Sequence, residues 1–132
     1  MRLSPLLAWP EKMWKSAASF ELPVMIGINL MDRDRADFPR VVEALGKKYG
    51  REVTPLQLPI GAESNFTGVV DLLTRKAWVW GGRDDPEDYE ITDVPEDMQD
   101  LVEEWREKLI ETAVEQDDEM LEQYLEGEEP SI

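Results

Sequence analysis

The feature that most constrains the fold is a short, unbroken apolar segment, Pro23–Ile28, which ends in a polar stretch that contains Asn29 and Asp32. Apolar residues at every position are typical of a parallel strand that is covered on both faces. We therefore predict a buried strand over residues 23–29. In sheets of this kind, ligand chemistry lies at the C-terminal ends of the strands.

Two amphipathic patterns flank this segment and predict helices. Apolar residues recur at helical spacing over residues 10–20, and again between Asp37 and Gly50. Asp37 is a good N-cap, and Gly50 is a good C-cap. The helix–strand–helix order over residues 1–50 is typical of a doubly wound α/β sheet.

The period of the pattern changes after Gly50 and predicts a small α+β unit over residues 51–132. Alternating apolar residues predict an antiparallel sheet, followed by two C-terminal helices. The expected strands cover residues 56–60, 68–80 (with a bend near Asp71) and 89–91, and the expected helices cover residues 95–116 and 120–125.

Charge is distributed very unevenly between the two parts of the chain. The net charge of the 132 residues is −16, but residues 84–129 hold 21 acidic residues and two basic ones, a net charge of −19. Such a surface repels phosphate backbones, so we expect no direct nucleic-acid binding by this half. The chain has no Cys and no His, which excludes thiol chemistry and the usual zinc ligands. No segment approaches the ~18 apolar residues of a membrane helix, so a cytoplasmic, membrane-free location is expected.

The stretch Asn29-Leu30-Met31-Asp32 resembles the guanine-reading element of GTPases, whose usual pattern is N-K-x-D. In that element the Asp carboxylate accepts hydrogen bonds from N1 and N2 of guanine, and the Asn amide lies near the O6/N7 edge. Asn29 and Asp32 match these two positions. Leu30 replaces the Lys, whose stem covers one face of the base.

A wider resemblance includes this element. The segments VMIGINLMDRDRADF (24–38), PLQLPIGAE (55–63), FTGVVDLL (66–73) and LEQYLEGEE (121–129) follow one another as in bacterial elongation factor G. The match covers about residues 22–130. Release factor 3 resembles the D-R-D-R segment but fits the rest poorly.

The resemblance implies an internal segment of a translational GTPase. Residues 1–50 are then expected to be a remnant of the GTPase core, a partial α/β half-sheet that includes the guanine-reading strand, and residues 51–132 the insertion called the G′ subdomain. Members of the family use GTP and Mg²⁺, act on the ribosome in translocation and recycling, and contact the acidic ribosomal stalk protein through this subdomain. The chain itself contains no G-x-x-x-x-G-K-[ST] phosphate loop and no D-x-x-G motif. We therefore expect it to bind no nucleotide and to catalyse nothing alone, with no catalytic and no metal-binding residue of its own.

Five residues of the acidic half are candidates for partner binding: Trp78, Trp80, Trp105, Glu104 and Glu111. Aromatic anchors within a charged rim are typical of transient interfaces. One interpretation is a groove formed by Trp78, Trp80 and the helix that carries Trp105. The alternative is that the tryptophans belong to the core and the sheet edge, while the acids form a solvated helix face.

Two other functional interpretations remain open from the sequence. The chain could be a free-standing acidic interaction protein with no nucleotide role, or a GTPase that receives its phosphate loop from another chain. The flanking genomic sequence would separate these interpretations. We also expect the strand over residues 23–29 to drive self-association as a homodimer, because an exposed strand edge readily pairs with another chain.

Overall fold

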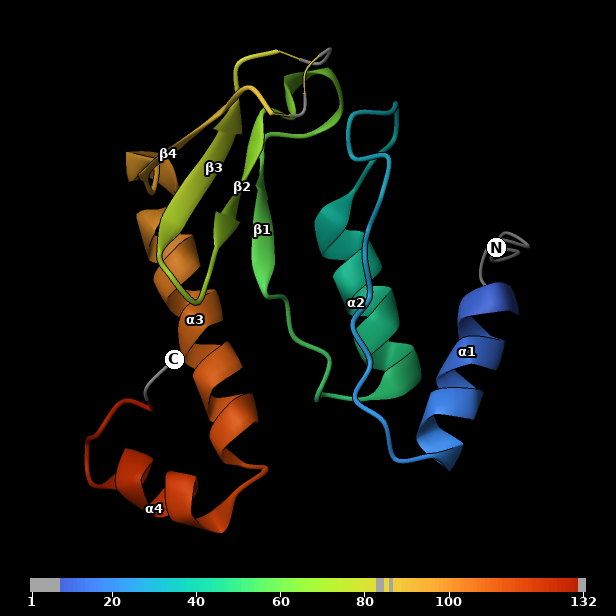
Figure 1. Cartoon of the computed structure of the whole chain (residues 1–132), viewed down its shortest axis with the longest axis vertical. Helices are drawn as coiled ribbons and strands as arrows, with labels where there is room; N and C mark the ends of the chain where they lie inside the picture. The colour runs from blue at the N-terminus through green and yellow to red at the C-terminus, as the bar shows by residue number, and fades with distance from the viewer. Residues whose placement is uncertain (1–7, 83–84, 86, 131–132) are drawn as a thin grey trace.

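The structure, a computed structural model, describes residues 8–82, 85 and 87–130. It confirms a mixed α/β chain with an antiparallel sheet and two C-terminal helices (Figure 1). The helices are α1 (Ala8–Ser19), α2 (Phe38–Tyr49), α3 (Gln99–Val114) and α4 (Asp118–Leu125), with short 3₁₀ turns at Glu63–Asn65 and Glu96–Met98. The strands are β1 (Gln57–Ile60), β2 (Gly68–Asp71), β3 (Lys76–Trp80) and β4 (Tyr89–Asp93).

The four strands form one antiparallel meander in the order β1-β2-β3-β4. The prediction of a single strand over residues 68–80 is wrong, because the chain reverses within it. Asp71 Oδ1 accepts the backbone N–H groups of Leu73 at 2.8 Å and Thr74 at 3.1 Å, and this closes a tight turn between β2 and β3. The chain therefore forms a complete hairpin where a bend near Asp71 was predicted, and the sheet has four strands instead of the expected three.

Helix α3 covers one face of the sheet and supplies the core (Figure 1). The predicted helix over residues 95–116 is shorter in the structure, because a 3₁₀ turn precedes it. Alternate residues of β2 and β3 point to α3, so Val70 and Ala77 are fully buried, whereas their neighbours in sequence point away. The buried cluster consists of Leu58, Val70, Leu72, Ala77, Val102 and Leu109.

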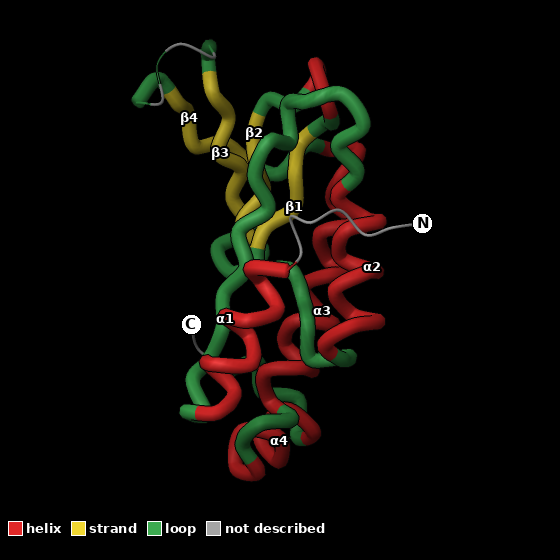
Figure 2. The backbone as a smooth tube through the Cα atoms, turned by 90° about the vertical axis from the view of Figure 1, so that its right-hand side faces the viewer, coloured by secondary structure: helices red, strands yellow, loops and turns green. Residues whose placement is uncertain are grey.

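Helices α1 and α2 stand beside the β1 side of the sheet (Figures 1 and 2). The two helices meet through the stacked rings of Trp14 and Tyr49, whose centroids are 4.1 Å apart. Asp37 caps α2 as predicted, because its Oδ1 accepts the N–H of Arg40 at 3.1 Å. Gly50 ends the helix with φ of 106°, which favours glycine.

The segment between α1 and α2 does not form the strand predicted over residues 23–29. It is extended, but it pairs with no strand among the described residues. Its apolar side chains are exposed rather than buried: the exposed fractions of Val24 and Met25 are 43% and 82%. A strand is stabilised by hydrogen bonds to neighbouring strands. All the strands that the structure describes belong to the β1–β4 sheet, which does not pair with this segment.

Candidate functional site

The loop over residues 29–35, named the guanine-reading loop for the element that it resembles, begins with a tight turn at Asn29 and Leu30. The side-chain oxygen of Asn29 accepts the backbone N–H of Leu30 at 2.8 Å, and Leu30 has a φ of 61°. The N–H of Arg33 then donates to the carbonyl oxygen of Leu30 at 3.2 Å. The carboxamide of Asn29 therefore stabilises its own loop.

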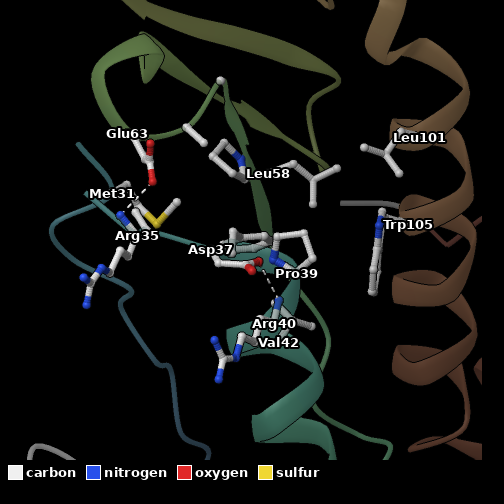
Figure 3. Close-up of a pocket in the computed structure, with 15 residues that line it drawn as sticks. Met31, Arg35, Asp37, Pro39, Arg40, Val42, Leu58, Glu63, Leu101 and Trp105 are labelled. Carbon is white, nitrogen blue, oxygen red and sulfur yellow. Dashed lines mark hydrogen bonds between the residues drawn. The ribbon is translucent and has the colours of Figure 1, made fainter. Parts of the chain in front are cut away.

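Met31 and Glu63 fix this loop to the connection between β1 and β2. Met31 is buried, and its carbonyl oxygen accepts the N–H of Glu63 at 3.1 Å. The Glu63 carboxylate in turn accepts the backbone N–H of Arg35 at 2.7 Å (Figure 3). The sequence did not predict that either residue anchors the loop. An apolar Met inside a polar loop was the available signal for the first, but no local signal pointed to Glu63.

Asp32 is exposed, and its carboxylate has no hydrogen-bond or ion-pair partner among the described residues. A free carboxylate at this place has the chemistry to accept a pair of N–H donors from a ligand. Leu30, two positions before Asp32 in the sequence, adds an apolar side chain that is 58% exposed. The four residues offer an exposed carboxylate acceptor and an apolar side chain, but no group that holds a phosphate.

A cavity of about 770 Å³ lies behind the loop, between the start of α2, β1 and α3. Leu101 and Trp105 reach into it from α3, opposite Pro39, while the side chains of Arg35 and Arg40 point away (Figure 3). Asn29 and Asp32 do not line this cavity. Its walls are largely apolar, and no group of acidic residues in the described part of the chain has the spacing of a metal site.

Comparison with known proteins gives a consistent result. No protein-family model matches the chain. Among curated proteins, elongation factor G 2 of Trichodesmium erythraeum is 52% identical over 122 residues, and elongation factor G 1 of Pseudoalteromonas atlantica is 54% identical over 122 residues. Both matches cover 92% of this chain and 18% of the relative.

The chain corresponds to an internal segment of elongation factor G. A crystal structure of a Thermus thermophilus protein shares its fold, with a TM-score of 0.76 and 28% identity over 92% of this chain and 17% of that one. The resemblance stated from the sequence is thereby confirmed. The chain spans less than a fifth of the length of the elongation factor G relatives that it matches.

The structure separates the candidate partner-binding tryptophans of this elongation factor G segment. Trp78 and Trp80 lie on the face of β3 that points away from α3, where the rings of Trp78 and Tyr89 are 5.1 Å apart. Trp105 lies on α3 and packs against the core on the opposite side. The three residues therefore do not form one groove, and they belong to two different surfaces.

Glu104 and Glu111 lie on the exposed face of α3, two helical turns apart. Lys108 lies between them, bonds to Glu104 at 2.5 Å and places its ammonium 4.6 Å from the centre of the Trp105 ring. The other acids of this acidic ridge are Asp100, Glu103, Glu107 and Glu115, of which Glu103 pairs with Arg75 and Glu115 with Arg51. Every helix among the described residues is too short or too polar to cross a bilayer.

Proposed function

We propose that the chain serves a translation factor of the elongation factor G type as its guanine-reading loop and as a protein-binding subdomain that works on the ribosome in the cytoplasm. The identity of 52% over 92% of the chain is the observation that carries this proposal. In this proposal, residues 1–50 belong to the GTPase core, and residues 51–132 form the insertion.

The acidic ridge of α3 supplies the binding surface, and its proposed partner is the stalk protein of the large ribosomal subunit. Glu104 and Glu111 provide charge, while the half-buried Trp105 and the 44% exposed Leu101 provide apolar contact. Although the stalk protein is acidic overall, we expect the part of it that contacts these acids to be basic, because opposite charges raise the association rate and salt weakens their effect. The expected interaction is therefore transient and salt-sensitive.

In our proposal, this chain alone neither binds a whole nucleotide nor hydrolyses it. Asp32 and the Asn29 loop fit the base-reading part of a GTP site, but the residues present do not fit the whole nucleotide. The phosphates and their Mg²⁺ require a backbone cradle and a Lys, which none of the 132 residues provides. We accordingly assign it no catalytic step.

An NMR titration of the isotope-labelled C-terminal domain of the stalk protein tests the binding role. Adding the chain at low salt should shift one patch of signals, and the shifts should shrink at moderate salt. The variant Glu104→Gln/Glu111→Gln should weaken binding. The variant Glu122→Gln/Glu126→Gln, which makes the same charge change on the exposed face of α4, should not. An absence of shifts at millimolar concentration would leave the insertion with a structural role only.

A further inference from the structure

A second surface lies along β4, the last strand of the sheet. β4 pairs with β3 on one side, and no described segment pairs with its other side. All five of its residues are exposed. An open edge of this kind is a template for the addition of another strand.

The register shows which backbone groups of β4 point outward. The N–H of Gly81 donates to the carbonyl of Asp88 at 2.9 Å, which continues the pairing of Trp80 with Tyr89. Because hydrogen-bonded and non-bonded pairs alternate, the N–H and C=O of Ile91 point away from β3. The N–H of Asp93 points the same way, and no described group accepts it.

Apolar side chains stand beside these free backbone groups. Ile91 is opposite Trp78, and Tyr89 is opposite Trp80, all on the face that points away from α3. The exposed fractions of Ile91 and Tyr89 are 54% and 43%. An added strand would therefore meet backbone partners at the edge and apolar contacts on the adjacent face.

Charge decides what kind of strand fits this edge. Residues 87–97 contain no basic residue, and among the ion pairs between described residues only that of Asp93 with Lys76, at 2.7 Å, involves this segment. The described acids along β4 and its flanks are Asp85, Glu87, Asp88, Glu90, Asp93, Glu96 and Asp97. A second copy of β4 would place these carboxylates against their own kind, and a nucleic acid would oppose them with phosphates.

We propose that the free edge of β4 binds a lysine- or arginine-rich extended segment of a partner protein by strand addition. In this mode main-chain hydrogen bonds give affinity, and side chains give selectivity. The basic side chains of the added strand would lie near Glu90 and Asp88, and its apolar side chains would contact Ile91 and Tyr89. This surface is separate from the α3 ridge, so it goes beyond the stalk interaction proposed above.

Isotope-labelled chain and capped ten-residue peptides test the proposal directly. The probe alternates lysine and valine, and one control peptide carries glutamate in place of lysine. A second control keeps the lysines but carries N-methyl groups on alternate valine amides, so that it cannot form a ladder. We expect the lysine peptide to shift the signals of β4 and to slow amide exchange at Ile91 and Asp93. Each control peptide should bind at least about tenfold more weakly.

Two variants of the chain complete the test. Ile91→Pro removes an outward N–H without removing a bond to β3, so it should weaken binding by a similar factor. The charge variant Asp88→Asn/Glu90→Gln should also weaken binding, whereas the matched Glu122→Gln/Glu126→Gln variant should not.

The N-methylated peptide keeps the test informative even if Ile91→Pro fails to fold. Three results would overturn the proposal. They are equal binding of the N-methylated peptide, shifts confined to α3 and α4, and no binding of the lysine peptide at millimolar concentration. The stalk titration is independent of β4, so either proposal can fail without the other.

Discussion

At the scale of single residues, Arg106 is a buried cation that connects three parts of the insertion. Its Nη1 donates to the carbonyl oxygens of Leu72 at 2.9 Å and Leu73 at 3.1 Å, and its Nη2 lies 3.4 Å from Glu129. Arg106→Met should therefore lower the free energy of unfolding by about 2–4 kcal/mol, because it leaves buried carbonyl groups without donors. Urea unfolding followed by tryptophan fluorescence measures this change.

Glu129→Gln is the matched control for Arg106. The Glu129 side chain is 60% exposed, so its ion pair is screened by solvent and its loss should cost no more than about 1 kcal/mol. Equal losses in the two variants would mean that the ion pair, rather than the carbonyl contacts, stabilises this region. The sequence showed only that Arg106 is one of two bases in an acidic half, since burial depends on how α3 meets the β2–β3 turn.

Asp93 gives a prediction about pH at the same scale. The hydrogen bond from Lys76, together with its positive charge, holds the pKa of the Asp93 carboxyl below its usual range. A pKa that folding lowers gives stability that is present above the unfolded-state pKa and is lost as pH falls through the folded-state pKa. In Lys76→Met, an NMR pH titration should show a higher pKa for Asp93.

Glu43 provides an internal control for this titration. Its pKa is lowered by a hydrogen bond from Lys47, on a different element from the Lys76 substitution. The Glu43 titration should therefore stay unchanged in Lys76→Met. An unchanged pKa for Asp93 would show that the Lys76 contact does not persist in solution.

At the scale of elements, the sequence predicted best where the signal was local. The caps of α2 and the apolar stripe of α3 depend on neighbouring residues, and both helices were found close to their expected positions. The β2–β3 hairpin was missed because its turn has no glycine or proline and depends on the Asp71 side chain. The docking of Glu63 on the Met31 loop was missed because it joins segments about 30 residues apart along the chain.

Substitutions at two glycines test the backbone geometry of the turn after β1 and of helix α2. Gly61 has φ of 77°, and a Cβ there would lie 2.0 Å from the carbonyl oxygen of Asn65. Gly61→Ala should therefore cost at least about 2 kcal/mol of unfolding free energy. Gly46, in the interior of α2, has open space around it, so Gly46→Ala should stabilise the chain by about 0.5–1 kcal/mol. Urea unfolding of both variants gives the comparison, and a neutral Gly61→Ala would contradict the tight turn.

At the scale of the whole molecule, the extended segment 22–30 shows where sequence reasoning was limited. Its apolar pattern predicted a buried strand, but a strand needs partners that the described residues do not supply. Its apolar groups remain exposed instead. The guanine-reading loop at its end is nevertheless held in place, because Met31 and Glu63 anchor it independently of any sheet.

This exposed segment should make the chain self-associate, as a dimer at high concentration. Met25 and Ile26 are 82% and 40% exposed, and unpaired backbone accompanies them. Sedimentation velocity should show a concentration-dependent dimer that Met25→Asp weakens. Leu125→Asp, at a residue on α4 that is 77% exposed, is the control and should leave association unchanged. A monomer at all concentrations would contradict the prediction.

The nucleotide affinity of the whole chain should be too weak to measure. Asp32 offers a free carboxylate to a guanine edge, but most of the affinity for a nucleotide comes from contacts to its phosphates and Mg²⁺, for which the sequence has no phosphate loop. Titration calorimetry with GDP and Mg²⁺ should give no binding heat at high protein concentration. Leu30→Lys, which restores the usual motif, should not rescue binding, because an extra contact to the base cannot replace the missing phosphate contacts. A micromolar dissociation constant that Asp32→Asn abolishes would show instead that the base-reading loop is sufficient to bind guanine nucleotides.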